Sequence, residues 1–312
     1  MKLTYRVTCA AVVTLWLQAI VGSIPAGEQE KAAAEARHAK TTLNAQDRAE
    51  MILIPEGRFW MGSTSDEVDA QFRDTGLPED WKKYTQDEEP RHEKTLEPFY
   101  IYKYEVTNAQ YKAFMDATGH RSPPHWNGND YPADKGQHPV VEVSWDDAQA
   151  YCRWAGTQLP TEAQWEFVAR GPEPANGQSS RCFPWGEPWD RRLCNNASLH
   201  ADKEIQSAED WKTWYEGDQK ARFPLTSPVG AFPKSVSPFG VHELAGNAWE
   251  WCADIPSKYP DQRPEDAEDK TMRARRGGSW ANVAMHIRSA DRQPAAHDNL
   301  HIYTGFRCVK LP

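Results

Sequence analysis

The sequence contains 312 residues, with 36 Lys and Arg against 45 Asp and Glu, which gives a formal net charge of −9. Because an acidic chain gains no counterion release on a polyanion, this balance argues against DNA or RNA as a partner. The mean hydropathy of −0.79 excludes a polytopic membrane protein, and the 14 Trp, 11 Tyr and 10 Phe supply too much apolar surface for a disordered chain.

The first 23 residues have the pattern of a secretory signal peptide. Lys2 and Arg6 form a basic start, and residues 7–20 form a mostly apolar stretch that is short for a membrane span. An uncleaved anchor is the alternative interpretation. Residues 24–50, rich in Ala, Glu, Lys and Gln, predict a flexible linker before a domain over 51–312. We therefore expect a periplasmic or secreted protein with no stable membrane insertion after cleavage.

The first part of the domain predicts two strands separated by a long charged segment. Met51–Phe59 predicts a strand followed by a turn at residues 60–63. Residues 64–97 are highly charged and lack periodicity, so we expect a surface excursion. Phe99–Val106 alternates and is rich in aromatic residues, which predicts the second strand.

Three helices are predicted next, each preceded by a residue that can accept hydrogen bonds from the first turn. These N-caps are Thr107 before 108–117, Ser144 before 145–155, and Thr161 before a helix that starts at Glu162. Gln164 is placed to complete a capping box with Thr161, and Gly156 ends the second helix. Beyond Arg170 the content of Pro, Gly, Trp and Asn predicts loops with short strands. The absence of βαβ alternation disfavours a Rossmann or TIM architecture.

Five cysteines follow the predicted leader: Cys152, Cys182, Cys194, Cys252 and Cys308. In an oxidising compartment we expect four of the five to pair and one to remain. No pair of Cys or His residues has the spacing of a structural zinc site.

Standard nucleotide-binding and hydrolase motifs are missing from the sequence. Two weaker patterns stand out. Glu243 and Glu250 flank a glycine-containing turn, and carboxylates with backbone carbonyls suit Ca²⁺, although such a pair also fits a solvated face. His297 and His301 have the spacing of a metal-binding pair on a helix, but Pro294 favours a loop there.

A series of motifs from Met51 to Pro312 resembles the formylglycine-generating enzyme and sulfatase-modifying factor (FGE-sulfatase) domain family. In chain order they are MILIPEGRFWMGS, DEEPRH, YEVTN, HPV, VSW, AYC, LPTEAQWE, FPWG, PVG, GNAWEW, RGGSW and GFRC. The resemblance implies a single α+β domain of the C-type-lectin-like type, low in regular secondary structure.

The resemblance also implies bound calcium. One site would use the side chains of Glu243 and Glu250 with the carbonyls of Gly246 and Ala248. Glu243 stands where the family more often has Asn or Asp. A second site would use Asn196, the Ala197 carbonyl and Asp218, although residues 199–217 resemble an insertion.

Cys152 and Cys308 match a disulfide of the family. Cys182 and Cys194 would then form the second pair, which the family does not support, and Cys252 would stay free.

The chain departs from the family at its catalytic cysteines. Formylglycine generators bind Cu(I) through two cysteines shortly after the GGS motif, whereas residues 280–288 contain none, which argues against sulfatase activation. Trp249, Ser279 and Arg292 map onto pocket positions of the family. His286 would occupy or border the vacated site, together with Asn282, Met285, His297 and His301.

Two functions remain from the resemblance. One is a cysteine-independent oxidase or tailoring enzyme acting on a peptide or a peptide-derived small molecule, with His286 or Asp291 as base. It resembles exported family members implicated in maturation of the siderophore pyoverdine, and a redox metal beside calcium is left open. The alternative is a non-catalytic binding or accessory module with an aromatic pocket, such as an assembly factor for a periplasmic nitrite reductase.

Overall fold

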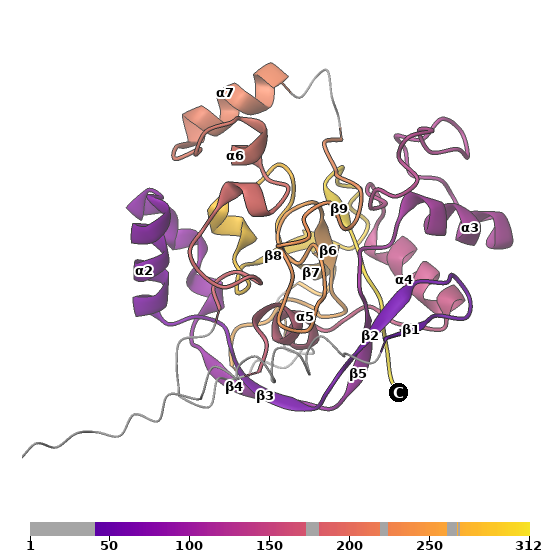
Figure 1. Ribbon diagram of the computed structural model, residues 1–312, viewed down its shortest axis with the longest axis horizontal. Coiled ribbons are helices and arrows are strands. Elements are labelled where there is room, and N and C mark those ends of the chain that lie inside the picture. Colours follow the sequence, from indigo (N-terminus) through magenta and orange to yellow (C-terminus); the bar gives the residue numbers. More distant parts are fainter. Residues whose placement is uncertain (1–40, 173–180, 219–223, 261–266, 268) are drawn as a thin grey trace, which may run out of the picture.

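The computed structural model describes residues 41–172, 181–218, 224–260, 267 and 269–312, with only the backbone of Asp218. The predicted leader and the linker up to residue 40 lie outside these ranges. Short strands occupy the centre of the molecule, with α2 (Ser65–Thr75) on one side and α3 (Asn108–Thr118) on the other (Figure 1). This mixed architecture confirms the predicted α+β fold. None of the described helices is both long and apolar enough to cross a bilayer.

The first sheet shows that the domain begins before residue 51. Its strands are antiparallel in the order β1 (Thr41–Leu43), β2 (Glu50–Ile54), β5 (Phe99–Tyr102) and β10 (Val309–Lys310). Asp47 Oδ2, between β1 and β2, accepts hydrogen bonds from the hydroxyls of Tyr102 at 2.8 Å and Tyr151 at 2.5 Å. The prediction of a linker as far as residue 50 is therefore wrong. Residues 41–50 are held to the domain by polar contacts such as those of Asp47. Their sequence therefore lacks the apolar periodicity from which a strand would be predicted.

The second sheet corrects two further predictions. The single strand predicted over residues 51–59 is two strands, since β3 (Gly57–Met61) leaves β2 and pairs with β4 (His92–Leu96). Between β3 and β4 lie α2, η1 (Glu79–Tyr84) and η2 (Gln86–Glu88), where we predicted an irregular excursion. Thr64 and Glu67 form a capping box at the start of α2, and Phe72 is buried. Only Val68, Phe72 and Thr75 of α2 are buried, so the sequence of this helix is mostly charged or polar and shows little apolar periodicity.

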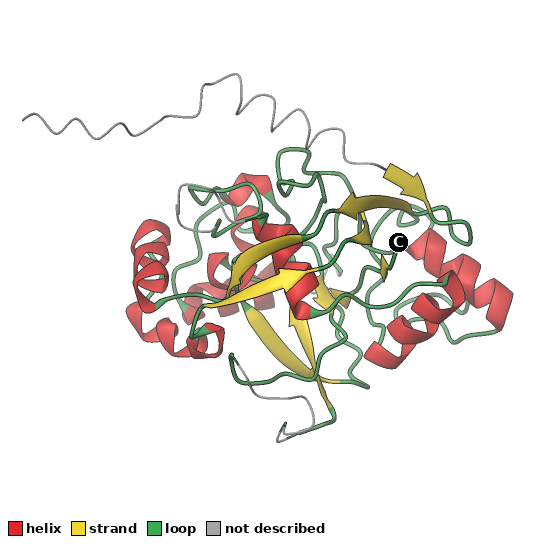
Figure 2. Cartoon of the chain, turned by 90° about the horizontal axis from the view of Figure 1, so that it is seen from below, coloured by secondary structure: helices red, strands yellow, loops and turns green. Residues whose placement is uncertain are grey.

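The three predicted helices are confirmed with their caps. They are α3, α4 (Trp145–Ala155) and α5 (Glu162–Arg170), and the side chains of Thr107, Ser144 and Thr161 each accept a hydrogen bond from the backbone N–H three residues on. Gly156 ends α4 with a φ of 67°, a left-handed conformation that suits glycine. Figure 2 shows helices at both ends of the molecule and others in its middle, next to the strands.

The third sheet carries the candidate site. Its strands follow the order β8 (Arg292–Ala296), β7 (Met272–Arg276), β6 (Trp249–Trp251) and β9 (Thr304–Gly305), and only β6 and β9 are parallel. Four short helices complete the described elements: η3 (Arg191–Leu193), α6 (Ala197–His200), α7 (Ala208–Asp218) and η6 (Ala284–Ile287). Helix α7 forms most of the segment that resembles an insertion in the sequence.

The sulfurs of Cys152 and Cys308 lie 3.0 Å apart and both side chains are buried, one on α4 and the other just before β10. The structure holds all five described cysteines as thiols. No contact joins Cys182 to Cys194 among the described atoms, since Cys194 Sγ instead accepts a hydrogen bond from Asn196 Nδ2 at 3.4 Å. Both pairings stay predictions, and the geometry supports only the first.

We expect protein folded under oxidising conditions to contain a Cys152–Cys308 disulfide. The two residues are 156 positions apart, so the cross-link would restrict the unfolded chain and raise the free energy of unfolding by about 2–4 kcal/mol. Peptide mapping without reductant detects the link, and urea unfolding with and without dithiothreitol measures its effect. A Cys252→Ala variant should keep the link. A cross-link from Cys152 to any other cysteine would contradict the prediction.

Candidate active site

Two adjoining cavities open between η1, α7, η6 and the third sheet. One has a volume of about 390 Å³ and the other about 270 Å³. They share four lining residues, Trp211, Asn282, His286 and Gln293. We call the joined space the His286 cavity. Its size suits one aromatic ring with a substituent.

His286 lies on η6 between the two cavities, beside a buried carboxylate. Its Nδ1 is 3.4 Å from each carboxylate oxygen of Asp291, which is fully buried, while 22% of the His286 side chain is exposed. The ring centroid lies 6.2 Å from that of Trp249. Nε2 has no hydrogen-bond partner among the described residues, so it is the nitrogen left for a ligand. A carboxylate on one imidazole nitrogen orients the other toward a proton donor.

Aromatic side chains form the walls of the His286 cavity. Trp249 comes from β6 and Tyr303 from the turn before β9, while Trp211 and Tyr215 come from α7. The rings of Trp211 and Tyr215 stack with centroids 4.6 Å apart, and Trp211 Nε1 donates to the Ala281 carbonyl at 2.7 Å. Neither of these α7 residues was predicted from the sequence to line the site. The spacing of Trp211, Trp214 and Tyr215, which places them on one helical face, was the available signal.

Arg275 lines the smaller cavity from β7. Only 7% of the residue is exposed, and Nη1 donates to Thr304 Oγ1 at 2.9 Å. Its guanidinium carbon lies 5.5 Å from the ring centroid of Trp249 and 5.7 Å from that of Trp251. Burial lowers the pKa of Arg275 to about 10. Sequence analysis did not select this residue, because a basic residue beside the RGGSW motif does not reveal whether it is buried.

Ser279 and Arg292, which we predicted in the pocket, lie outside the His286 cavity. Ser279 is fully buried, and its hydroxyl donates to Asn282 Oδ1 at 2.6 Å, so it shapes the turn before η6. Arg292 Nε donates to Glu162 Oε1 at 2.9 Å, and its guanidinium packs 4.2 Å from the ring centroid of Tyr259. The structure therefore brings together Trp249 and His286 from the predicted set but gives the other two structural contacts.

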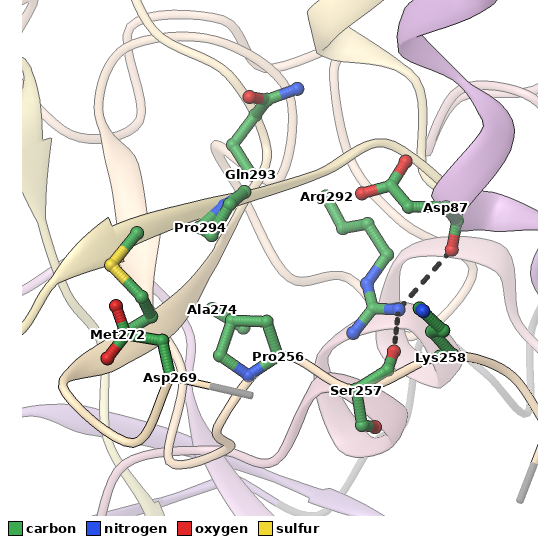
Figure 3. Close-up of a pocket in the computed structure, with 10 residues that line it drawn as sticks. All are labelled: Asp87, Pro256, Ser257, Lys258, Asp269, Met272, Ala274, Arg292, Gln293 and Pro294. Atoms are coloured by element: carbon green, nitrogen blue, oxygen red, sulfur yellow. Dashed lines mark hydrogen bonds between the residues drawn. The ribbon is translucent and has the colours of Figure 1, made fainter. Parts of the chain in front are cut away.

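Arg292 lines a further pocket of about 300 Å³, which among the described residues shares only Gln293 with the His286 cavity (Figure 3). Arg292 Nη1 donates to the carbonyls of Ser257 and Asp87 there, while Gln293 points away from the guanidinium. Consecutive strand residues point to opposite sides, so Gln293 reaches the His286 cavity and Arg292 does not, although Gln293 also lines part of the Arg292 pocket. Asp87 keeps a solvent-exposed side, but partial burial and the charge of Asp291 raise its carboxyl pKa to about 7.

The two C-terminal histidines also lie apart from the catalytic candidates. His297 Nδ1 contacts Asp146 Oδ2 at 2.6 Å on the surface, and the ring of His301 stacks on Tyr303 with centroids 5.0 Å apart. Met285 and Asn282, by contrast, line the larger cavity as expected. His301 therefore borders the site through Tyr303, and His297 does not contact it.

The first predicted calcium site contains a buried ion pair. Glu250 binds Arg307 through both carboxylate oxygens at 2.6 Å and accepts a hydrogen bond from Trp165 Nε1 at 2.8 Å. Glu243 Oε1 accepts from the backbone N–H of Gly230 at 2.9 Å, while its buried Oε2 has no partner. Burial raises the pKa of Glu243 to about 7. Only one carboxylate oxygen of this set is therefore open.

The described oxygens predicted to form the second calcium site accept hydrogen bonds within helix α6. Asn196 Oδ1 accepts from the backbone N–H of Leu199 at 3.0 Å as the N-cap of α6, and the Ala197 carbonyl accepts from Ala201 N at 2.9 Å. Asp218 ends α7, and its side chain lies outside the described part.

Among the described atoms, neither set presents the six to eight converging oxygens that a calcium ion needs. Within the described ranges no three His, Cys, Asp or Glu side chains form a possible metal site. Calcium binding stays a prediction from the resemblance. Metal analysis of the purified protein, together with melting curves with and without EDTA, tests it directly.

Comparisons with known proteins match the chain over most of its length. The family described as "Sulfatase-modifying factor enzyme 1-like domain" matches residues 36–312. A formylglycine-generating enzyme of Thermomonospora curvata is 32% identical over 84% of this chain and 93% of its own. An "Inactive C-alpha-formylglycine-generating enzyme 2" of Bos taurus is 30% identical over 83% and 87%. The solved structure of PvdO from Pseudomonas aeruginosa superposes with a TM-score of 0.61 at 25% identity, covering 88% of this chain and 98% of PvdO.

Proposed function

Since the chain belongs to the sulfatase-modifying factor enzyme 1-like family, we propose that it is an exported, cysteine-independent tailoring oxidase rather than a formylglycine generator. Its substrate is a peptide or a peptide-derived small molecule, as in siderophore maturation. The observation that carries this proposal is the His286–Asp291 pair in an aromatic cavity. The cavity lies next to the RGGSW motif, where the family has its catalytic cysteines. This position supports a catalytic role for the cavity.

Thiol chemistry is unavailable in the described part of this cavity. No cysteine lines it, and the five described cysteines are all buried, with at most 2% of each residue exposed. Cu(I) binding at the family position requires soft thiolate ligands. The segment from Trp280 to Arg288 instead supplies Asn282, Met285 and His286 to the cavity. These residues favour acid–base chemistry over thiol oxidation.

His286 can act as a general base toward a hydroxyl or amine on the substrate ring. Its Nε2 takes one proton from the substrate. The resulting electron-rich anion passes two electrons and a second proton to dioxygen. His286 then donates the first proton to the reduced dioxygen. The substrate loses two hydrogens and dioxygen becomes hydrogen peroxide, so atoms and electrons balance. Asp291 acts as a positioning residue, because its carboxylate holds the imidazole through Nδ1.

The walls of the cavity support an aromatic substrate. Trp249, Trp211, Tyr215 and Tyr303 present ring faces and edges around His286, and such rings bind aromatic groups in offset or edge-to-face contacts. A catechol attached to a peptide has the ring, the acidic hydroxyl and the second hydroxyl hydrogen that this mechanism needs.

The proposal is tested by measuring dioxygen uptake and hydrogen peroxide release with short peptides that carry a catechol chromophore. We expect one peroxide formed per dioxygen consumed and per chromophore oxidised. Binding of these peptides without dioxygen uptake would contradict the enzyme assignment and favour the accessory module. N-terminal sequencing of protein recovered from the periplasm or medium checks the proposed export.

A further inference from the structure

We infer that the His286 cavity binds a carboxylate on an aromatic ligand, and that Arg275 is its anchor. This inference rests on the proposed function only in using the same cavity, and it names the class of substrate. No described residue neutralises the charge of Arg275 at close range.

Arg275 differs from the other buried arginines of the described chain. Each of the others has a buried glutamate as salt-bridge partner: Arg170 and Arg276 with Glu166, Arg288 with Glu88, Arg292 with Glu162, and Arg307 with Glu250. Arg275 has no carboxylate within 4.0 Å among the described residues. Isolated buried charges are costly, so proteins normally pair them. A partner supplied by a ligand would complete the pattern.

The orientation of Arg275 leaves part of the guanidinium open to the cavity. Thr304 binds Nη1, and Nε is buried without a partner. Nη2 has no partner in the described part of the chain and is not among its buried unsatisfied atoms. The rings of Trp249 and Trp251 pack beside the guanidinium and restrict its movement. Arginine held in this way presents fork-like donors that match a carboxylate.

The same cavity has room for a ring beside the carboxylate. Trp249 contacts Arg275 and also lies 6.2 Å from His286, so it connects the anion anchor to the proposed base. A ligand whose carboxylate meets Arg275 would place its ring among Trp249, Trp211 and Tyr303. The ligand class is therefore an aromatic carboxylate, and an aromatic amide of the same shape should bind less well.

The test compares N-acetyl-tyrosine with N-acetyl-tyrosinamide, which differ only in the charged group. Titrations followed by tryptophan fluorescence and by calorimetry should show the carboxylate binding about 10- to 100-fold more tightly to the parent protein. In Arg275→Met this preference should vanish, and in Arg275→Lys a part of it should remain. Arg273→Met is the matched control, since Arg273 lies on the same strand but packs on Trp145 outside the cavity.

Stability separates a loss of binding from a loss of folding. Because Arg275 is buried without a close counter-charge, Arg275→Met should melt at the same temperature as the parent or higher. A parent protein that binds neither probe at about 10 mM, or binds both equally, would overturn the inference, as would Arg275→Met that keeps the preference. The measurement needs no turnover, so failure of the oxidase assay alone leaves the anion site standing.

Discussion

The His286→Ala variant should lose a factor of about 100 to 10,000 in the rate of dioxygen-coupled turnover, because a positioned general base contributes about that much. The effect should appear in kcat, since the aromatic walls and Arg275 that bind the substrate remain. His286 has 22% of its side chain exposed and one polar contact with Asp291, so its loss should change the melting temperature little. Steady-state rates with an oxidisable peptide and thermal melts measure the two effects.

His297→Ala provides the matched control for His286. It removes the same side chain from the same part of the sequence, but His297 contacts Asp146 at the surface and lies outside the cavity. We expect its kcat to equal that of the parent. If His286→Ala kept more than about a tenth of the parent rate, the assignment of the base would be wrong.

The Arg307→Met variant should lower the free energy of unfolding by about 3–5 kcal/mol, because it removes one member of a buried ion pair. Both oxygens of the fully buried Glu250 depend on Arg307, and Glu105 and Glu243 add further buried carboxyl groups nearby. Urea unfolding at neutral pH measures the loss. The remaining carboxylate would be left with one neutral donor, the indole N–H of Trp165.

A double variant shows whether the charge or the shape of Arg307 matters. Arg307→Met combined with Glu250→Gln should recover part of the lost stability, because the amide leaves no uncompensated charge. Equal stabilities for the single and double variants would show that pairing with Glu250 does not supply the contribution of Arg307. Its packing and its hydrogen bonds to the carbonyls of Tyr102, Lys103 and His242 would then supply it.

Local signals in the sequence predicted the capped helices well. Thr107, Ser144 and Thr161 form their caps within three residues of sequence, so no long-range information is needed. Helix α2 was missed although Thr64 and Glu67 offer the same signal, because we judged a charged segment by its lack of apolar periodicity. The motif series placed the pocket close to Trp249 and His286.

The remaining site residues depend on contacts between distant segments. Arg275 and Arg292 are both basic residues near a family motif, and only the sheet decides that one faces the His286 cavity and the other Glu162. Beyond Arg170 we predicted loops with short strands but assigned no strand to residues 292–296. The alternation along β8, which directs Arg292 and Gln293 to different sides, was therefore not available. Trp211 and Tyr215 reach the cavity only because α7 folds back onto Ala281.

The buried position of Arg275 in an acidic protein has a consequence for binding kinetics. The overall charge of −9 repels an approaching anion over distances of about a Debye length, while the local pair with Arg275 forms only after water has left the cavity. Added salt screens the long-range repulsion more than it weakens the buried contact. Stopped-flow association rates for an anionic ligand should therefore rise with ionic strength, in contrast to the slowing seen for surfaces that steer their ligands by attraction.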